Sequence, residues 1–144
     1  MGADRESMIT ATPSATMTGV SAEIAPRSLI IKLTCGAEAA ERANQAWTVA
    51  AAGVAAGVSV TVWLTGEGVW FAVPGQQPDL ELPFATAVAD LVETVRGSGR
   101  IVVCTQCAAR RELVESDLLP GVAIAGAASF VEAALADGVQ ALVY

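Results

Sequence analysis

The residues of this sequence best suited to chemistry are two cysteines three positions apart. Cys104 and Cys107 form the motif Cys104-Thr105-Gln106-Cys107, while the third cysteine, Cys35, lies far from them in the chain. A Cys-x-x-Cys spacing permits a disulfide and lowers the pKa of a thiol. Three uses of the pair are open at this point: a metal site, a dithiol–disulfide couple, and one nucleophilic thiolate that carries sulfur as a persulfide while the other thiol assists or stays idle.

The absence of histidine limits the chemistry further. It excludes Ser-His-Asp and Cys-His nucleophile systems, and it excludes every zinc site that contains histidine. A closed zinc site needs four ligands, and one chain offers three cysteines as soft ligands. We therefore expect no metal within one chain and no cofactor, although a cysteine site shared between subunits stays open.

The surroundings of Cys104 favour a reactive thiol. It ends an apolar run at residues 101–103, and a short helix is predicted at residues 108–113, with Cys107 at its opening. The start of a helix carries partial positive charge and free N–H groups, which stabilise a thiolate. Arg110 and Arg111 follow within one turn and can add positive charge. The alternative is that the cysteines are small buried apolar residues and the arginines solvated surface charges.

Glu67 is the other polar candidate, because it stands between two glycines directly after a predicted strand. Glycines allow a tight turn with unusual dihedral angles. Glu67 could face the thiol as an acid or as a hydrogen-bond acceptor, or it could be a plain turn carboxylate. Trp70 and Phe71 follow in the same loop, and we expect the core or a neighbouring subunit to cover them.

The pattern of the chain predicts alternating strands and helices that position these residues. Ser28 begins the first strand, and Pro83 suits the first turn of a helix whose buried stripe starts at Phe84. The predicted strands are 28–34, 58–64, 100–104, 122–125 and 139–144, and the predicted helices are 38–56, 83–97, 108–113 and 127–136. Strands joined by helices of this length indicate a three-layer α/β/α sandwich with a parallel sheet of about five strands. The carboxyl ends of its strands would bring together Cys35, residues 66–68 and Cys104.

Composition sets the broad class. Hydrophobic residues make up 53% of the 144 residues and charged residues 16%, which suits one folded domain, expected at residues 28–144 after a flexible tail at 1–27. A net charge of −7 argues against nucleic acid and against an anionic membrane surface as partners. The uncharged stretch 43–66 is interrupted by glycines and polar residues, so no membrane span is expected. Few cysteines and no recognisable signal peptide indicate a cytoplasmic protein.

Several segments together resemble the DsrE/DsrF-like family, which includes the TusD-type sulfur-relay proteins. Trp63-Leu64-Thr65-Gly66-Glu67-Gly68-Val69 is similar to the family's segment after its second strand, and Ile101-Val102-Val103-Cys104 is similar to its cysteine segment. Arg110 stands six positions after Cys104, as an arginine does in the family, and Leu118-Leu119-Pro120-Gly121-Val122 resembles the approach to its last helix. The resemblance covers residues 28–144.

The resemblance implies a parallel-sheet fold and sulfur transfer through a persulfide on Cys104. Cys107 matches the second cysteine of those members that carry Cys-x-x-Cys, and Arg110 matches the downstream arginine. It also implies a homo-oligomer, often a trimer or hexamer, and sulfur donor and acceptor proteins as partners. The alternative function is a non-catalytic oligomeric or small-ligand-binding module of the same fold with an idle thiol. A flavodoxin-like nucleotide site is weaker, because residues 34–38 offer one glycine beside a carboxylate.

Overall fold

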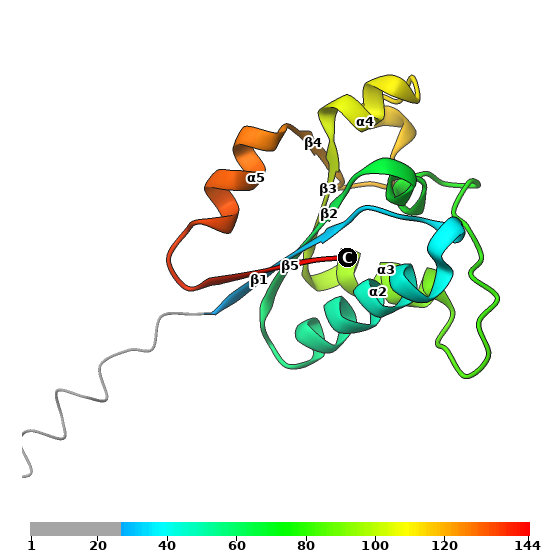
Figure 1. The fold of residues 1–144 in the computed structure, drawn as a ribbon, viewed down its shortest axis with the longest axis horizontal. Coiled ribbons are helices and arrows are strands. Elements are labelled where there is room, and N and C mark those ends of the chain that lie inside the picture. The colour runs from blue at the N-terminus through cyan, green and yellow to red at the C-terminus, as the bar shows by residue number, and fades with distance from the viewer. Residues whose placement is uncertain (1–26) are drawn as a thin grey trace, which may run out of the picture.

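A five-stranded parallel sheet forms the centre of the molecule (Figure 1). The computed structural model describes residues 27–144; the predicted tail at 1–27 lies outside them apart from Arg27. The strands are β1 (Ser28–Leu33), β2 (Ser59–Leu64), β3 (Arg100–Cys104), β4 (Ala123–Ala125) and β5 (Val139–Val143), arranged in the order β4-β3-β2-β1-β5. All neighbouring strands run parallel, so the prediction of an α/β sandwich with five parallel strands is confirmed.

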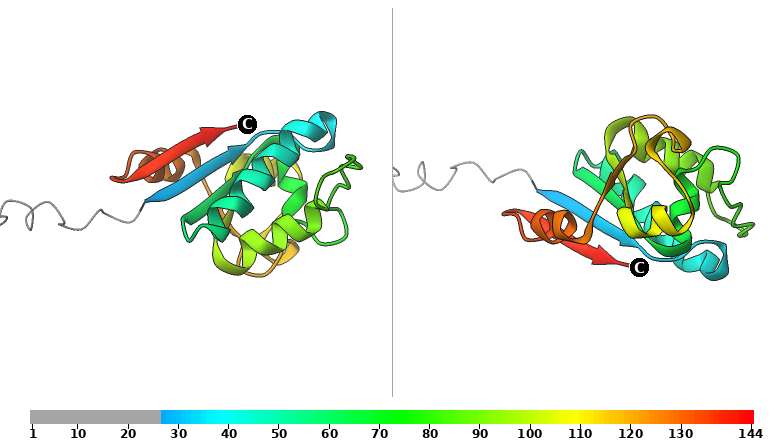
Figure 2. Two further views of the ribbon diagram at one scale, coloured as in Figure 1. Left: turned by 90° about the horizontal axis from the view of Figure 1, so that it is seen from below. Right: turned by 90° about the horizontal axis from the view of Figure 1, so that it is seen from above.

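One face of the sheet is covered by two helices, α2 (Ala40–Ala55) and α3 (Val88–Ser98), as Figure 2 shows. Each helix buries one apolar stripe, which on α2 is mostly alanine and so lets the helix approach the strands closely. Trp47 fills the remaining space and meets Phe71 edge to face, with their ring centroids 5.6 Å apart. This layer holds the larger part of the hydrophobic core.

The opposite face is covered more thinly. Among residues 27–144 it is α5 (Ala127–Ala134) that packs there, and it buries no residue completely. Its Phe130 lies edge to face against Trp63, with ring centroids 5.4 Å apart, over a small core that also contains Ile30 and Val102. Both faces are thus covered, which completes the three layers, but the α5 layer leaves more apolar surface at the rim.

The carboxyl end of β3 lies where the connecting helices change from one face of the sheet to the other. The helices after β1 and β2 lie on one face, whereas the helix after β4 lies on the other. β3 pairs with both β2 and β4, and Cys104 is aligned with Ala125. Crevices at the carboxyl edge of a parallel sheet form where successive connections leave toward opposite faces. Cys104 therefore ends its strand at a position of the kind that serves as a functional site.

Three short 3-10 helices and one short α-helix complete the described fold. They are η1 (Ala37–Ala39), η2 (Gly66–Ala72), η3 (Glu115–Asp117) and α4 (Thr105–Arg110). No helix within residues 27–144 combines the length and the apolarity that crossing a bilayer requires.

Two helix starts differ from the sequence prediction by three residues or more. α3 begins at Val88 and not at Pro83, because Phe84 has a φ of 62° and leaves the helical region of dihedral space. Phe84 is fully exposed instead of joining the buried stripe, which consists of Val88 and three later residues. α4 begins at Thr105, three residues earlier than predicted, so it starts directly after Cys104.

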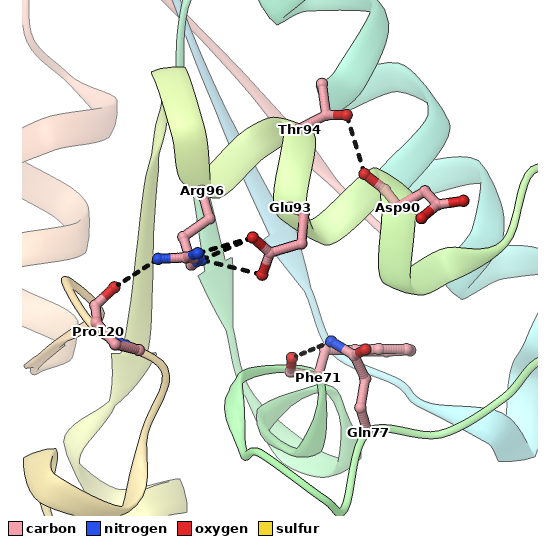
Figure 3. A network of polar contacts seen from close by, with 7 residues as sticks. All are labelled: Phe71, Gln77, Asp90, Glu93, Thr94, Arg96 and Pro120. Atoms are coloured by element: carbon pink, nitrogen blue, oxygen red, sulfur yellow. Dashed lines mark hydrogen bonds and ion pairs between the residues drawn. The ribbon is translucent and has the colours of Figure 1, made fainter.

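Polar contacts fix the segments around α3 and behind η2 (Figure 3). The Arg96 guanidinium on α3 pairs with Glu93 at 2.7 Å and also donates to the carbonyl oxygen of Pro120, at 3.4 Å, in the segment before β4. The Gln77 side-chain amide donates to the carbonyl oxygen of Phe71 at 2.8 Å, which closes the chain behind η2. The Arg96 contact thus joins the segments that precede β3 and β4, at the end of β3 opposite Cys104, whereas the Gln77 contact holds the loop after β2.

Candidate functional site

Cys104 is the last residue of β3 and the residue that caps the start of α4. Residues 101–103 before it are at most 2% exposed, so the strand is anchored, whereas Cys104 itself is partly exposed. Alternation along β3 puts Cys104 on the side of Val102, and its side chain also packs against the larger core cluster, which contains Cys107. The thiol is therefore held by a rigid strand while remaining open to a small reactant.

The pKa of the Cys104 thiol lies below its ordinary value. Partial burial raises this pKa, but the backbone N–H of Cys107, the Cys107 thiol, the backbone N–H of Gln106 and the positive charge of Lys32 together lower it more. No well-directed hydrogen bond joins the Cys104 side chain to the first turn of α4. The N–H groups therefore act on the thiolate mainly through their partial charge.

Lys32 is a contributor that the sequence analysis did not single out. It lies on β1, where its ammonium nitrogen stands 5.1 Å from the centroid of the Phe130 ring, on the α5 side of the sheet. Its positive charge lowers the pKa of Cys104 across the sheet. The available signal was a lone lysine inside an otherwise apolar strand, the run Ser28-Leu29-Ile30-Ile31-Lys32-Leu33, near the strand's carboxyl end.

Cys107 occupies the third position of α4 and is 7% exposed. Its sulfur accepts a hydrogen bond from the backbone N–H of Gly66, with a nitrogen-to-sulfur distance of 3.2 Å. The two cysteines are therefore close but differ in access, because Cys104 meets solvent and Cys107 is shielded by the loop after β2. All three cysteines are free thiols.

The glycines around Glu67 allow this loop to approach the end of β1. Gly66 has a φ of 54°, and a Cβ at this position would lie 2.7 Å from the carbonyl oxygen of Thr34. A Cβ on Gly68 would lie 3.0 Å from the carbonyl oxygen of Leu33. Larger residues would push the loop outward. The Gly-Glu-Gly sequence thus sets the position of Glu67 and of the N–H group that reaches Cys107.

Glu67 binds Arg111 and Trp70. One carboxylate oxygen accepts from the Arg111 guanidinium at 2.8 Å, and the other accepts from the Trp70 indole N–H at 2.9 Å. The hydrogen bond from Arg111 is the main cause that holds the pKa of Glu67 below its usual value, and it outweighs partial desolvation. Glu67 is therefore a carboxylate at neutral pH, which favours the role of hydrogen-bond acceptor over that of acid.

Arg111 extends this network back to α4. Its guanidinium donates to the carbonyl oxygen of Cys107 at 3.1 Å and lies 5.9 Å from the centroid of the Trp70 ring. The side chain is only 17% exposed. The contacts among Glu67, Trp70 and Arg111 thus join η2 to α4 near the surface. The hydrogen bond from the Gly66 N–H to the Cys107 sulfur joins the same two helices in the interior. Phe71 is fully buried by the chain itself, whereas Trp70 stays partly exposed beside the Arg111 guanidinium.

Of the other predicted residues, Cys35 adjoins the loop that carries Glu67, since a Cβ on Gly68 would lie 3.1 Å from the carbonyl oxygen of Cys35, whereas Arg110 lies outside this network. Arg110 is exposed, and its guanidinium donates to the Gln106 side chain at 3.4 Å. The structure therefore brings Cys104, Cys107 and Glu67 to one edge, with Arg111 between them, and leaves Arg110 at the surface. Cys35 is buried, and burial is the main cause that raises the pKa of its thiol, followed by the negative charge of Glu38.

The described part of the chain contains no group of three or more His, Cys, Asp or Glu side chains placed to hold a metal ion. A surface hollow of about 500 Å³ between α2 and residues 82–86 has none of the site residues in its lining. The site thus lies at the carboxyl edge of the sheet, where the Cys104 thiol, with its lowered pKa, stands near the buried Cys107 thiol.

Comparison with known proteins agrees with this fold. The model of the DsrE/DsrF-like family matches residues 28–143 of the chain. The crystal structure of the ychN protein from E. coli has a TM-score of 0.67 and 16% sequence identity, and the match covers 82% of this chain and 99% of that one. MTH1491, a protein of unknown function from Methanobacterium thermoautotrophicum, has a TM-score of 0.58 and 13% identity with the same coverage. No curated protein sequence matches this chain significantly.

Replacing Lys32 by methionine should slow the reaction of Cys104 with a neutral alkylating reagent severalfold near pH 7. The reason is that the ammonium group helps to lower the pKa of this thiol, so its loss raises the pH at which the thiolate forms. Peptide-resolved mass spectrometry across a pH series measures this rate. Arg100→Met is the matched control, because it removes a positive charge at the opposite end of β3. Equal rates in wild type and Lys32→Met would contradict the assigned role.

Replacing Glu67 by glutamine should lower the melting temperature at pH 7 by about 1–3 °C, because a partly exposed ion pair contributes up to about 1 kcal/mol. The pKa of Glu67 is lowered on folding, so its contribution is present above the ordinary Glu pKa of about 4.3. The contribution is lost as the pH falls through the lowered value in the folded protein. The difference in melting temperature between wild type and Glu67→Gln should therefore be smaller at pH 3 than at pH 7.

Glu132→Gln, on the exposed side of α5, is the control for this measurement, since Glu132 forms no ion pair among residues 27–144. The melting temperature of Glu132→Gln should equal that of the wild type at pH 7 and at pH 3. A deficit of Glu67→Gln that stays the same at pH 3 would show that packing, and not the carboxylate charge, is what the substitution removes.

Proposed function

Because the chain belongs to the DsrE/DsrF-like family, we propose that it carries sulfur as a persulfide on Cys104. The single observation that carries this proposal is the position of Cys104, a partly exposed thiol of lowered pKa at the carboxyl edge of β3. The thiolate is the nucleophilic form of cysteine, and it needs access to its reactant. Cys35 meets neither condition, because it is buried and its pKa is raised.

The transfer step needs no change in the number of electrons. The Cys104 thiolate attacks the outer sulfur of a donor persulfide, and a bond forms between this sulfur and Cys104 Sγ. The bond between the two donor sulfurs breaks, its electron pair leaves with the inner donor sulfur, and the donor thiolate takes up a proton. Delivery to an acceptor thiol repeats the same step with Cys104 as the donor.

The neighbouring groups have separate roles in this proposal. Lys32 and the N–H groups of α4 favour the thiolate that begins the transfer. Glu67 and Arg111 act as positioning residues, because their ion pair joins η2 to α4 and does not reach Cys104. Arg110 is exposed, with a hydrogen bond to Gln106, and is placed to meet an acidic group of a sulfur donor or acceptor protein. A reducing compartment such as the cytoplasm suits a carrier that works with free thiols.

Incubation with a small-molecule persulfide, followed by measurement of the intact mass, tests this function. The Cys107→Ser variant should gain the mass of one sulfur atom, located on Cys104 by peptide mapping, and lose it again when a reductant is added. We use this variant because it leaves Cys104 as the one thiol of the motif. The same variant with Cys35→Ser added should also gain one sulfur, whereas the variant with Cys104→Ser added should gain none. Absence of sulfur on Cys104 would leave an idle-thiol module as the better description.

We also propose that the protein forms a homo-oligomer, a trimer or hexamer. Large apolar side chains are exposed on the thinly covered side: Val131 and Leu135 at 51% and 79%, and Val143 on β5 at 65%. Val131 and Leu135 stand four residues apart and so share one face of the helical segment. Burial of such a surface between subunits is the usual explanation for its exposure in one chain. Phe71 does not need a neighbour, because the chain buries it, and Trp70 is half-buried against Arg111.

Light scattering at micromolar concentration should therefore report a multiple of 14.6 kDa. Leu135→Glu should shift the protein toward the monomer, because it places a charge in the proposed interface. Phe84→Glu is the control: Phe84 is also exposed, but it lies on the loop before α3 and lines a hollow beside α2. A wild type that is monomeric at all concentrations would refute the oligomer, and dissociation by Phe84→Glu alone would place the interface elsewhere.

A further inference from the structure

Cys107 is a thiol that simple persulfide transfer does not use. It lies three residues after Cys104, with Cys104 capping α4 and Cys107 in the first turn. Cys107 belongs to the larger core cluster and Cys104 packs against the same cluster, so the two side chains border a common part of the interior. The Cys107 side chain is also among the groups that lower the pKa of the Cys104 thiol.

The two thiols differ in how a reactant reaches them. Cys104 is partly exposed, whereas Cys107 is 7% exposed and lies beneath the loop that carries Gly66. A sulfur donor therefore meets Cys104 first. The Gly66 N–H holds the Cys107 sulfur at 3.2 Å, on the inner side of the site. From there Cys107 can reach the inner sulfur of a persulfide on Cys104, while external thiols have access to the outer one.

We propose that Cys107 is a resolving thiol: it attacks Cys104 Sγ of the persulfide, forms the Cys104–Cys107 disulfide and releases the carried sulfur as hydrogen sulfide. This inference rests on the proposed persulfide function and adds a second fate for the sulfur. When an acceptor thiol is present, it takes the outer sulfur. When none is present, Cys107 discharges the carrier.

Atoms and electrons balance within the chain. The bond between Cys107 Sγ and Cys104 Sγ forms, and the bond between Cys104 Sγ and the outer sulfur breaks. The electron pair of the broken bond leaves with the outer sulfur as HS⁻, which takes up the proton that Cys107 gave up. The outer sulfur is reduced to sulfide, and the two cysteine sulfurs are oxidised to a disulfide. An external dithiol then reduces this disulfide and restores both thiols.

The test loads reduced full-length protein with one equivalent of a small-molecule persulfide, removes the excess, and follows the released sulfide and the intact mass over time. Wild type should release about one sulfide per chain and end with two hydrogens fewer than the reduced protein, as a disulfide between Cys104 and Cys107 requires. Cys107→Ser should keep its persulfide at least about tenfold longer, because it lacks the intramolecular attack. Serine preserves the size and polarity of the side chain and can still accept from Gly66.

Two further variants separate the possible outcomes. Cys35→Ser should behave like wild type, and Cys104→Ser should release no sulfide, since Cys107 is shielded from the donor. Equal persulfide lifetimes in wild type and Cys107→Ser would overturn the resolving role while leaving the carrier function intact. If Cys107→Ser gains no sulfur on Cys104, the carrier function fails, and the resolving role fails with it.

Discussion

The burial of β3 is the constraint on which the site depends. Ile101, Val102 and Val103 are almost completely buried, and the strand is paired with β2 on one side and β4 on the other. A strand fixed on both edges and both faces has little freedom to shift its register. Cys104, the next residue, therefore has a defined position at the carboxyl edge, where the chain turns directly into α4. Both the access of the thiol and its contacts with the helix start follow from this position.

The comparison of Cys104 with Cys35 shows how much the setting matters. Both cysteines follow strands at the same edge of the sheet, yet the pKa of Cys35 is raised and that of Cys104 is lowered. Cys35 is desolvated beside the carboxylate of Glu38, whereas Cys104 lies beside backbone N–H groups and shares a face of the sheet with Lys32. The same side chain is thus inert packing at one position and a candidate nucleophile at the other.

Much of the fold could be predicted because its signals are local. The apolar run ending at Cys104 gave the bounds of β3 correctly, since a strand buried on both faces reads as a continuous hydrophobic segment. The start of α3 was wrong, because Pro83 and Phe84 carry a plausible helix-start pattern, while the actual chain passes through a positive φ at Phe84 and becomes helical only at Val88. Local propensity could not reveal that the loop bends away from the core there.

The sequence by itself determined the parallel α/β sandwich, the family and the position of Cys104 at a strand end, because hydrophobic periodicity and motif spacing are properties of neighbouring residues. The tertiary structure decided which charges meet at the site. Lys32 comes from β1, and Arg111, adjacent to the predicted Arg110, is the arginine that pairs with Glu67, 44 positions away. Such partners depend on strand order and on the direction in which each side chain points, and neither is encoded in the spacing between residues along the chain.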